Sequence, residues 1–375
     1  MDSFDVVIVG GGPAGSSCAW ALRESGLNVA ILDKQTFPRN KVCGGWITPQ
    51  VLEELEIDPA EYGRGRILQP ITGFRTGPIR GDAVETSYGR PVSYGIRRCE
   101  FDGYLLERCG ARVFQGEPVQ RLERSGGAWI INGHVRACML VGAGGTFCPV
   151  ARFLGAKVNG EALVRAQEAE FVMDRRQSSE CSVREEIPEL YFCSDMKGYA
   201  WCFRKQNVLN VGLGRLDRHS LTTHVTDFLR FLKQAGRLSF DLPATLLGHA
   251  YLLFGTAGRD VAGDGVLLAG DAAGVAYAQS GEGIRPAVES GLLAANVILT
   301  AQGTYTLERL ERYRQLLAAR FGAADRNPWS SLGRHLPAQL IPWLAKPLLR
   351  SGWFTREIVL NRWFLRQNDP VLKLT

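Results

Sequence analysis

The sequence predicts an α/β protein in which a parallel-sheet unit is interrupted by β-rich material. Two short apolar runs, Phe4–Val9 and Val266–Asp271, have the composition of buried parallel strands, and each leads into glycines and a helical pattern. Residues 60–95 and 162–214, which lie between these runs, show short strand-like pieces and alternating aromatic patterns instead. Because parallel-strand signals stand on both sides of this material, we expect one domain to be interrupted by another.

The composition is that of an ordinary globular protein. The chain has 375 residues, of which 45% are hydrophobic and 22% charged, so the disordered and disulfide-scaffold classes are excluded. The nine cysteines show no metal-binding spacing and predict reduced thiols and no metal site. The acidic N-terminus runs straight into a strand pattern without a signal peptide, which favours a cytoplasmic location. The net charge of +6 is mild and gives no reason to expect nucleic acid as a partner.

The first apolar run opens a βαβ unit. A helix is expected over residues 14–25, stopped near Gly26, and a second strand over Asn28–Asp33. Periodicity predicts the remaining elements, which are helices at 97–109, 220–236, 284–300 and 306–321 and two strand runs within 128–142. None of the five histidines has catalytic or metal spacing, and His219 and His224 are expected as surface helix residues.

A glycine-rich loop connects the first strand to the first helix. Gly10, Gly12 and Gly15 form the pattern GxGxxG, which permits a tight turn, admits a pyrophosphate and lets the helix pack closely on the strand. The free N–H groups at the helix N-terminus favour the phosphates. Asp33 ends the next strand, where an acid accepts hydrogen bonds from the ribose hydroxyls of an adenosine. This unit predicts a bound dinucleotide, and the acid indicates FAD or NAD rather than NADP.

A second strand-turn-helix also carries an acid. Asp271 follows Gly270 at the end of a buried strand, where an unpaired carboxylate would be costly, so it needs a polar partner. The alternative is that Asp271 caps a helix. The sequence GEG at residues 281–283 opens the helix 284–300 and offers N–H groups and a positive dipole end to an anion. A reduced flavin, which is negative at its pyrimidine end, is such a partner.

Five stretches between residues 4 and 300 carry more specific patterns. They are Gly10–Gly15 with Asp33, Lys41–Gly45 (KVCGG), Arg98–Leu105 (RCEFDGYL), Gly270–Gly274 with Ser280–Ile284 (GDAAG and SGEGI), and Gly198–Phe203 with Gly212–Gly214 (GYAWCF and GLG). Together they resemble the flavoprotein family typified by para-hydroxybenzoate hydroxylase and, within it, the geranylgeranyl reductase branch. The last two stretches resemble patterns specific to that branch.

The resemblance implies an α/β fold with a discontinuous, Rossmann-like FAD-binding domain, a β-rich substrate domain and a helical C-terminal region. The expected boundaries are 1–60, 92–157 and 255–325 for the FAD-binding domain, 61–91 and 158–254 for the substrate domain, and 326–375 for the C-terminal region. The implied cofactor contacts, from the ADP half to the flavin ring, are Ala14, Gly15, Asp33, Lys34 and Val119, then Asp271, Cys43, Gly44 and Arg98, and finally Gly283 and Ile284.

Two positions depart from the family pattern. Gly144 stands where the wider family often has Asp, so one cofactor contact is missing or replaced. Arg204 stands where the reductase signature has Pro, which leaves the exact substrate open.

Aromatic residues near these motifs predict an apolar substrate pocket facing the flavin. Tyr199, Trp201 and Phe203 alternate and therefore share one face of a strand, and Trp46 follows the loop that holds Cys43. The alternative is the ordinary core face of a sheet. For Cys43, one reading is a thiol that tunes the flavin or donates a proton, and the other is a small residue in a tight turn.

The tail concentrates basic and tryptophan residues. Residues 328–375 contain seven Lys or Arg and two acidic residues, so this tail accounts for +5 of the total net charge of +6. It also contains four of the eight tryptophans, namely Trp329, Trp343, Trp353 and Trp363. This pattern is typical of a segment lying on anionic lipid at the inner face of a membrane, and equally of a helical cap packed on the substrate domain.

The sequence thus predicts an FAD-dependent oxidoreductase. In the first hypothesis, reduced flavin delivers hydride from N5 to an alkene carbon of an isoprenoid or prenyl-lipid substrate, and water, Cys43 or Tyr199 supplies the proton. The alternatives are a monooxygenase that hydroxylates a small aromatic substrate and a flavin-bound assembly or lipid-binding protein without activity. Because the sequence has a single dinucleotide loop, the electron donor, NADPH, NADH or ferredoxin, is expected to bind transiently, and a quinol is also compatible.

Overall fold

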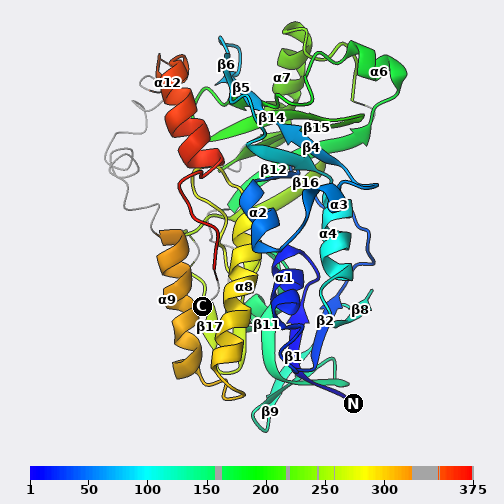
Figure 1. Cartoon of the computed structure of the whole chain (residues 1–375), viewed down its shortest axis with the longest axis vertical. Helices are drawn as coiled ribbons and strands as arrows, with labels where there is room; N and C mark the ends of the chain where they lie inside the picture. The colour runs from blue at the N-terminus through cyan, green and yellow to red at the C-terminus, as the bar shows by residue number, and fades with distance from the viewer. Residues whose placement is uncertain are drawn as a thin grey trace.

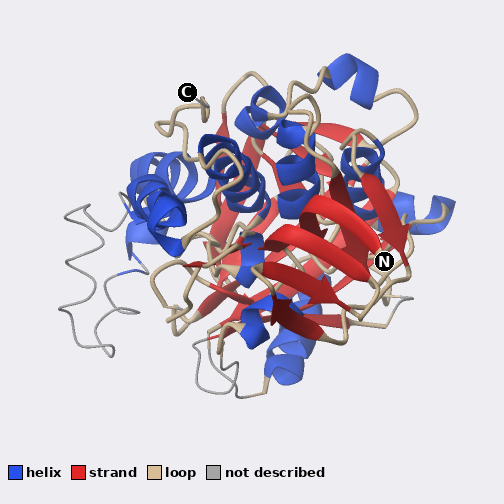
Figure 2. Cartoon of the chain, turned by 90° about the horizontal axis from the view of Figure 1, so that it is seen from below, coloured by secondary structure: helices blue, strands red, loops and turns tan. Residues whose placement is uncertain are grey.

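The computed structural model describes residues 1–156, 163–216, 220–242, 245–256, 258–322, 345 and 347–373. In the described chain the strands form an eight-stranded, mainly parallel sheet, a seven-stranded sheet and a small three-stranded sheet. Figure 1 shows β1, β2 and β11 with α1, α8 and α9 in the lower half of the molecule, and the seven-stranded sheet with α7 and α12 in the upper half. Figure 2 shows the strands from below, surrounded by helices. No disulfide joins any two of the nine cysteines, all of which lie in the described residues.

The eight-stranded sheet contains both predicted buried strands. In sheet order its main path is β17 (Ala262–Gly263), β18 (Val266–Leu268), β11 (Val135–Gly142), β1 (Asp2–Val9), β2 (Val29–Asp33) and β8 (Arg112–Gln115). From β18 to β8 all neighbours are parallel, whereas β17 is antiparallel, as are β10 (Ala128–Ile131) and β9 (Leu122–Ser125), which extend from β11. The carboxyl ends of the parallel strands therefore lie at one edge, where ligands bind in such sheets.

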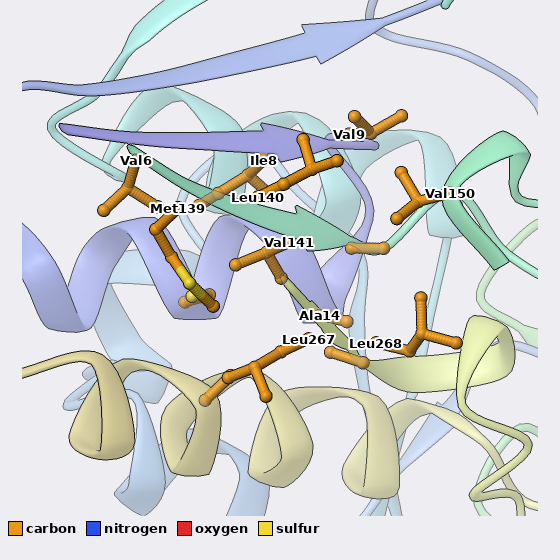
Figure 3. Packing of buried hydrophobic residues seen from close by; sticks show 14 of the residues in the cluster. Val6, Ile8, Val9, Ala14, Met139, Leu140, Val141, Val150, Leu267 and Leu268 are labelled. Atoms are coloured by element: carbon orange, nitrogen blue, oxygen red, sulfur yellow. The ribbon is translucent and has the colours of Figure 1, made fainter. Parts of the chain in front are cut away.

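Three long helices pack with this sheet around one hydrophobic core. They are α1 (Pro13–Leu22), α8 (Ile284–Thr300) and α9 (Leu307–Phe321). Figure 3 shows Met139, Val141 and Leu267 among the buried side chains between the strands and the helices. The backbones of α1 and α8 touch, since a Cβ on Gly291 would lie 2.2 Å from the Ala14 carbonyl oxygen.

The seven-stranded sheet has two different faces. Its order is β16 (Leu247–Leu252), β12 (Leu163–Val172), β15 (Val208–Arg215), β14 (Gly198–Lys205), β13 (Glu189–Phe192), β5 (Gly73–Pro78) and β6 (Val84–Ser87). Helix α7 (Leu221–Gln234) packs on one face, where Ala200 and Cys202 of β14 lie. Trp201 and Phe203 belong to a separate cluster on the other face. The predicted alternation along β14 is confirmed, and it leaves the aromatic face free of α7.

The remaining elements are short and connect these layers. They are β3 (Trp46–Ile47), β7 (Ser93–Ile96) and β4 (Leu68–Ile71) of the small sheet, and helices α2 (Pro49–Glu54), α3 (Pro59–Tyr62), α4 (Arg98–Glu107), α5 (Pro149–Phe153), α6 (Arg175–Glu180), η1 (Gly270–Ala272) and α12 (Gly352–Phe354), with a π-helix, η3 (Thr355–Phe364). The predicted helix 14–25 ends earlier, at Leu22, where Arg23 closes the last turn. Helix α6 interrupts the region expected to be β-like, and Asp174 with Gln177 forms the capping box that could have revealed it.

The described part of the C-terminal region packs back onto the molecule. Phe364 of η3 joins the aromatic cluster of the seven-stranded sheet. Beyond it, the Pro370 carbonyl oxygen accepts hydrogen bonds from Arg285 at 3.0 Å and Arg320 at 2.7 Å, and the Leu372 amide donates to Glu54 at 3.1 Å. The reading as a helical cap on the substrate domain thus holds for Phe364 of η3, whereas Pro370 and Leu372 are not helical and contact α2, α8 and α9 instead. Trp329, Trp343 and His219 lie outside the described residues.

Candidate active site

A cavity of about 660 Å³ joins the two large sheets. At one end it is lined by the loops that follow β1, β2, β11 and β18, at the carboxyl edge of the parallel sheet. At the other end it is lined by side chains of β12, β13 and β14, on the face of the seven-stranded sheet that α7 leaves free. We name these the nucleotide end and the aromatic end.

The glycine loop shapes the nucleotide end. Gly10 adopts a positive φ of 113°, and a Cβ there would lie 2.4 Å from the Ala143 carbonyl oxygen. A Cβ on Gly15 would lie 1.9 Å from the Gly10 carbonyl oxygen, which accounts for the close packing of helix on strand. Gly12, in contrast, faces open space and has only the Arg39 guanidinium within 4 Å of such an atom. Gly10 and Gly12 line the cavity, whereas Gly15 lies behind it.

Asp33 lines the cavity at the same end. Its carboxylate accepts hydrogen bonds from the Gly11 amide at 2.7 Å and the Gln35 amide at 2.8 Å. Each carboxylate oxygen can accept more than one bond, so Asp33 keeps acceptor capacity toward the cavity. Lys34 and Val119 line the cavity beside it.

Two arginines share one buried carboxylate next to the glycine loop. Arg98 donates to both oxygens of Asp102 at 2.8 Å, and Arg39 lies 3.2 Å from the same carboxylate. The Nη1 of Arg39 is buried and has no hydrogen-bond partner among the described residues. The other terminal nitrogen, Nη2, would lie 3.4 Å from a Cβ on the open Gly12. A guanidinium that keeps one free donor beside such a loop suits a phosphate.

A polar cluster occupies the middle of the cavity. His249 of β16 lies 3.5 Å from Asp271, and Lys41 lies 2.8 Å from the His249 ring. Burial alone would raise the pKa of Asp271, but the hydrogen bond to His249 and the charge of Lys41 outweigh it and hold that pKa below its ordinary value. Asp271, which is half-buried, thus has polar partners. Gly283 and Ile284 line the cavity near this cluster.

The Cys43 loop separates the polar middle from the aromatic end. The Cys43 amide donates to Glu168 at 2.6 Å, and the Cys43 carbonyl accepts from Asn210 at 3.0 Å. A Cβ on Gly44 would meet Phe203 at 3.4 Å and the Trp201 ring nitrogen at 3.6 Å, so backbone and rings already lie almost in contact.

The aromatic end is a wall of rings from three separate segments. Trp46 stacks on Phe364 at 5.7 Å and meets Phe203 edge-on at 6.5 Å. Tyr199 meets Phe364 edge-on at 5.2 Å and Trp201 at 6.1 Å. These five rings all line the cavity. They make one end of it apolar, as small-molecule sites require.

Comparison with known proteins identifies the family. The model of the FAD-dependent oxidoreductases matches residues 5–81. A menaquinone reductase of Mycobacterium tuberculosis is 31% identical over 353 residues, which cover 86% of this chain and 81% of the relative. A digeranylgeranylglycerophospholipid reductase of Methanocaldococcus jannaschii is 26% identical, covering 84% and 82%. The crystal structure of a geranylgeranyl bacteriochlorophyll reductase-like protein of Thermoplasma acidophilum aligns with a TM-score of 0.74 at 24% identity, covering 93% and 88%.

The chain belongs to the geranylgeranyl reductase family of FAD-dependent oxidoreductases. In this family member the structure brings together nearly every residue that the motifs singled out. The residues that line the common cavity are Gly10, Gly12, Ala14, Asp33, Lys34, Cys43, Gly44, Trp46, Arg98, Val119, Tyr199, Trp201, Phe203, Asp271, Gly283 and Ile284.

The residues of this reductase-family chain fit FAD. Gly12 leaves room for a pyrophosphate, and the Arg39 guanidinium beside it keeps one buried nitrogen, Nη1, without a hydrogen-bond partner among the described residues. Helix α1 begins at the same loop with no side-chain cap, so its N-terminus is open to an anion. The chemistry of the nucleotide end therefore matches the cofactor on which the family depends.

The two departures from the family pattern have different consequences. Gly144 lines the cavity, so the residue that replaces the common Asp does face the site. Arg204 lies away from it, because its guanidinium donates to the carbonyls of Ser178 and Cys181 and lies 3.4 Å from Glu185. The Arg204 departure thus leaves the cavity wall itself unchanged.

Sequence reasoning missed several side chains that line the cavity. They are Arg39, Lys41, Glu168, His249, Tyr251, Glu282 and Phe364. Lys41 and Glu282 stood inside recognised motifs without an assigned role. The interpretation of the histidines was incomplete, because His249 reaches Asp271 only through the pairing of β16 with β12. For Glu168, its place in a strand with buried neighbours was the available signal.

Proposed function

We propose that this enzyme reduces carbon–carbon double bonds of an isoprenoid chain. The observation that carries the proposal is the continuity of the cavity, in which the Cys43–Gly44 loop lies between the polar middle and a wall of five rings. An extended apolar chain fits such a wall, whereas the polar middle of the cavity suits a cofactor. Menaquinone and digeranylgeranylglycerophospholipid, which the names of two relatives contain, both carry isoprenoid chains.

The proposed roles follow the position of each residue along the cavity. Ala14, Asp33, Lys34 and Val119 hold the ADP half of FAD, while Gly10, Gly12 and Gly15 build the turn beneath the pyrophosphate. The residues assigned to the ribityl and flavin half are Cys43, Gly44, Arg98, Asp271, Gly283 and Ile284. Trp46, Tyr199, Trp201 and Phe203 hold the substrate chain.

When bound and reduced, FAD supplies the hydride for such a reaction. The protein must exclude water from the reacting carbon and position the double bond, which the close approach of Gly44 to the rings favours. The reaction also needs a proton, for which the sequence predicts water, Cys43 or Tyr199 as the source. NADPH, NADH or ferredoxin is the proposed transient electron donor.

An anaerobic experiment tests this function. The purified protein is reduced with dithionite and mixed with a digeranylgeranyl lipid, and flavin absorbance and lipid mass are followed together. We expect the flavin to reoxidise while the lipid gains two hydrogens per double bond. Reoxidation only after air is admitted would contradict the proposal and favour hydroxylation of a small aromatic substrate.

We also propose that the C-terminal region contacts anionic lipid, from which a prenyl substrate is taken up. Trp353 is 67% exposed and Leu348 44% exposed, and the basic side chains of Arg350 and Arg356 lie near them in the chain. Within the described residues no helix is long and apolar enough to cross a bilayer. Flotation with phosphatidylglycerol vesicles tests the contact. We expect binding that Trp353→Ser weakens and that phosphatidylcholine vesicles do not support.

A further inference from the structure

Glu168 is a buried carboxyl that reaches into the aromatic end of the cavity. It lies in β12, is 4% exposed and lines the cavity. Gly212 on the neighbouring strand has room for no side chain, because a Cβ there would lie 2.3 Å from the Trp201 ring and 2.8 Å from the Glu168 Cβ. Glu168 therefore stands directly beside the indole that walls the substrate end.

The two oxygens of Glu168 have different surroundings. Oε1 accepts a hydrogen bond from the Cys43 amide at 2.6 Å. Oε2 is buried and has no hydrogen-bond partner in the described part of the chain. An orphaned buried oxygen is costly as a carboxylate and far less so as a protonated hydroxyl, which can donate to a group that enters the cavity.

The groups facing Glu168 do not force it to ionise. Lys205 of β14 lies 2.9 Å from Glu170 and donates to the Ile96 carbonyl, so its charge is already compensated. Glu170 also lies 3.5 Å from Arg97. Asn210 of β15 donates to Glu170, and β16 places Leu247 opposite Glu168 in the register. Burial, with a smaller contribution from the charge of Glu170, raises the pKa of Glu168 to about 7, against the opposing effects of the Cys43 amide, Lys205 and Asn210.

We propose that Glu168 is the acid that protonates the substrate during alkene reduction. This inference rests on the proposed function. As the π bond breaks, one carbon receives a hydride with its electron pair from the reduced cofactor, and its neighbour receives the Oε2 proton of Glu168. Two C–H bonds form, the cofactor is oxidised by two electrons, and the Glu168 carboxylate takes a new proton from solvent.

The other donors at the site are less suited to this step. The Tyr199 hydroxyl already donates to the Ser280 carbonyl at 2.6 Å, and burial raises the pKa of Tyr199 well above 10. The Cys43 sulfur accepts a hydrogen bond from the Gly45 amide at 3.4 Å. Burial also raises the pKa of Glu282 to about 7, but Glu282 lies in the loop before α8 rather than within the ring wall.

The test compares Glu168→Gln with the wild-type holoenzyme in anaerobic reoxidation by a digeranylgeranyl lipid. A general acid contributes roughly 10²–10⁴-fold, so we expect the rate to fall at least about 100-fold with flavin content and KM little changed. The wild-type rate should fall as the pH rises through about 7, because the acid form is the donor. The residual rate of Glu168→Gln should not show this fall with pH. Glu168→Asp should restore part of the rate and also its dependence on pH.

A second readout does not depend on turnover. With ¹³C-labelled glutamate, the infrared spectrum of the resting protein should contain a protonated carboxyl band that titrates near pH 7 and has contributions from Glu168 and Glu282. Glu168→Gln should remove part of this band, and Glu282→Gln should remove the other part. Glu189→Gln is the matched control, since Glu189 is a buried glutamate of the same sheet that binds Arg237 and does not line the cavity. It should leave both the band and the pH profile in place.

Two results would overturn the proposal. The first is a Glu168→Gln enzyme whose rate, and whose fall in rate as the pH rises through about 7, match those of the wild type. The second is a rate that loses this pH dependence in Glu282→Gln but keeps it in Glu168→Gln. If the wild-type protein reduces no prenyl lipid at all, the proposed function fails instead. The infrared band still reports whether Glu168 holds a proton near neutral pH, so the two failures are distinguishable.

Discussion

The two ends of the cavity are built by different means. At the nucleotide end, loops at the carboxyl edge of one sheet present backbone, arginines and a carboxylate, and Gly10 and Gly15 are needed because no side chain fits. At the aromatic end, rings converge from a strand of the second sheet, from β3 and from η3. The first end depends on local backbone geometry, and the second on long-range packing.

This difference predicts how each end responds to change. A loop in which backbone touches backbone has no spare volume, so a single methyl group disrupts it. A wall of rings can repack around a smaller side chain, so one truncation reshapes the substrate site and leaves the cofactor site intact.

The largest effect is expected from Gly15→Ala. Its new Cβ would lie 1.9 Å from the Gly10 carbonyl oxygen and 3.1 Å from Ile8, so strand and helix must separate. We expect a loss of about 3 kcal/mol or more in the free energy of unfolding, together with loss of bound flavin, measured by urea unfolding and by absorbance. Gly103→Ala is the control, because Gly103 lies within α4 with nothing within 4 Å and alanine should be neutral or stabilising there. Full flavin content in Gly15→Ala would contradict the expectation that the nucleotide end has no room for an added methyl group.

The substitution Arg39→Met tests whether this arginine binds the cofactor at the nucleotide end. Removing the guanidinium beside Gly12, with its unpartnered Nη1, should weaken FAD binding about 10- to 100-fold, while the aromatic wall stays in place. The dissociation constant is measured by titrating FAD into deflavinated protein. Arg121→Met, which removes an exposed arginine paired with Glu123, should not change it. An unaltered affinity in Arg39→Met would show that this donor serves another ligand.

Glu168→Gln tests the polar group of the aromatic end through stability. The unfolded carboxyl ionises near its ordinary pKa of about 4.3, whereas the folded one keeps its proton until about pH 7. The wild-type protein therefore loses stability as the pH rises through this window, and the variant does not. At pH 8 we expect the variant to be more stable by about 1–3 kcal/mol, with little difference at pH 4.5.

Urea unfolding of the holoprotein at the two pH values measures this effect. Glu189→Gln should show the opposite sign, because it leaves Arg237 without its buried partner. A wild-type protein that gains stability over Glu168→Gln as the pH rises would mean that the carboxylate is the favoured form.

The smallest effect is expected from Phe364→Leu at the aromatic end. The ring that stacks on Trp46 and meets Tyr199 is lost, so the wall loosens around the substrate chain. We expect kcat/KM for a prenyl lipid to fall about 10-fold, with flavin content unchanged. Phe228→Leu removes an equally buried ring on the α7 face of the sheet and should lower stability without altering kcat/KM. Equal kinetics for the two variants would place Phe364 outside the substrate site.

The nucleotide end could be predicted from the sequence because its determinants are local. The spacing of Gly10, Gly12 and Gly15 between a strand and a helix already specifies a turn, and Asp33 follows at the end of the next strand. The alternation of Tyr199 and Trp201 likewise predicts that their side chains lie on the same face of a strand, and the structure places both in one aromatic cluster.

The aromatic end and its acid were decided by the tertiary structure. Glu168 reaches the cavity through the register of β12 with β15, and Phe364 arrives from η3, more than 300 residues from the Trp46 on which it stacks. Arg39 gains its place above Gly12 from a loop with no motif of its own. The sequence by itself determined the turns and faces, since these depend on neighbouring residues. Only the folded chain determined which side chains meet, because sheet pairing and helix packing join residues that share no spacing.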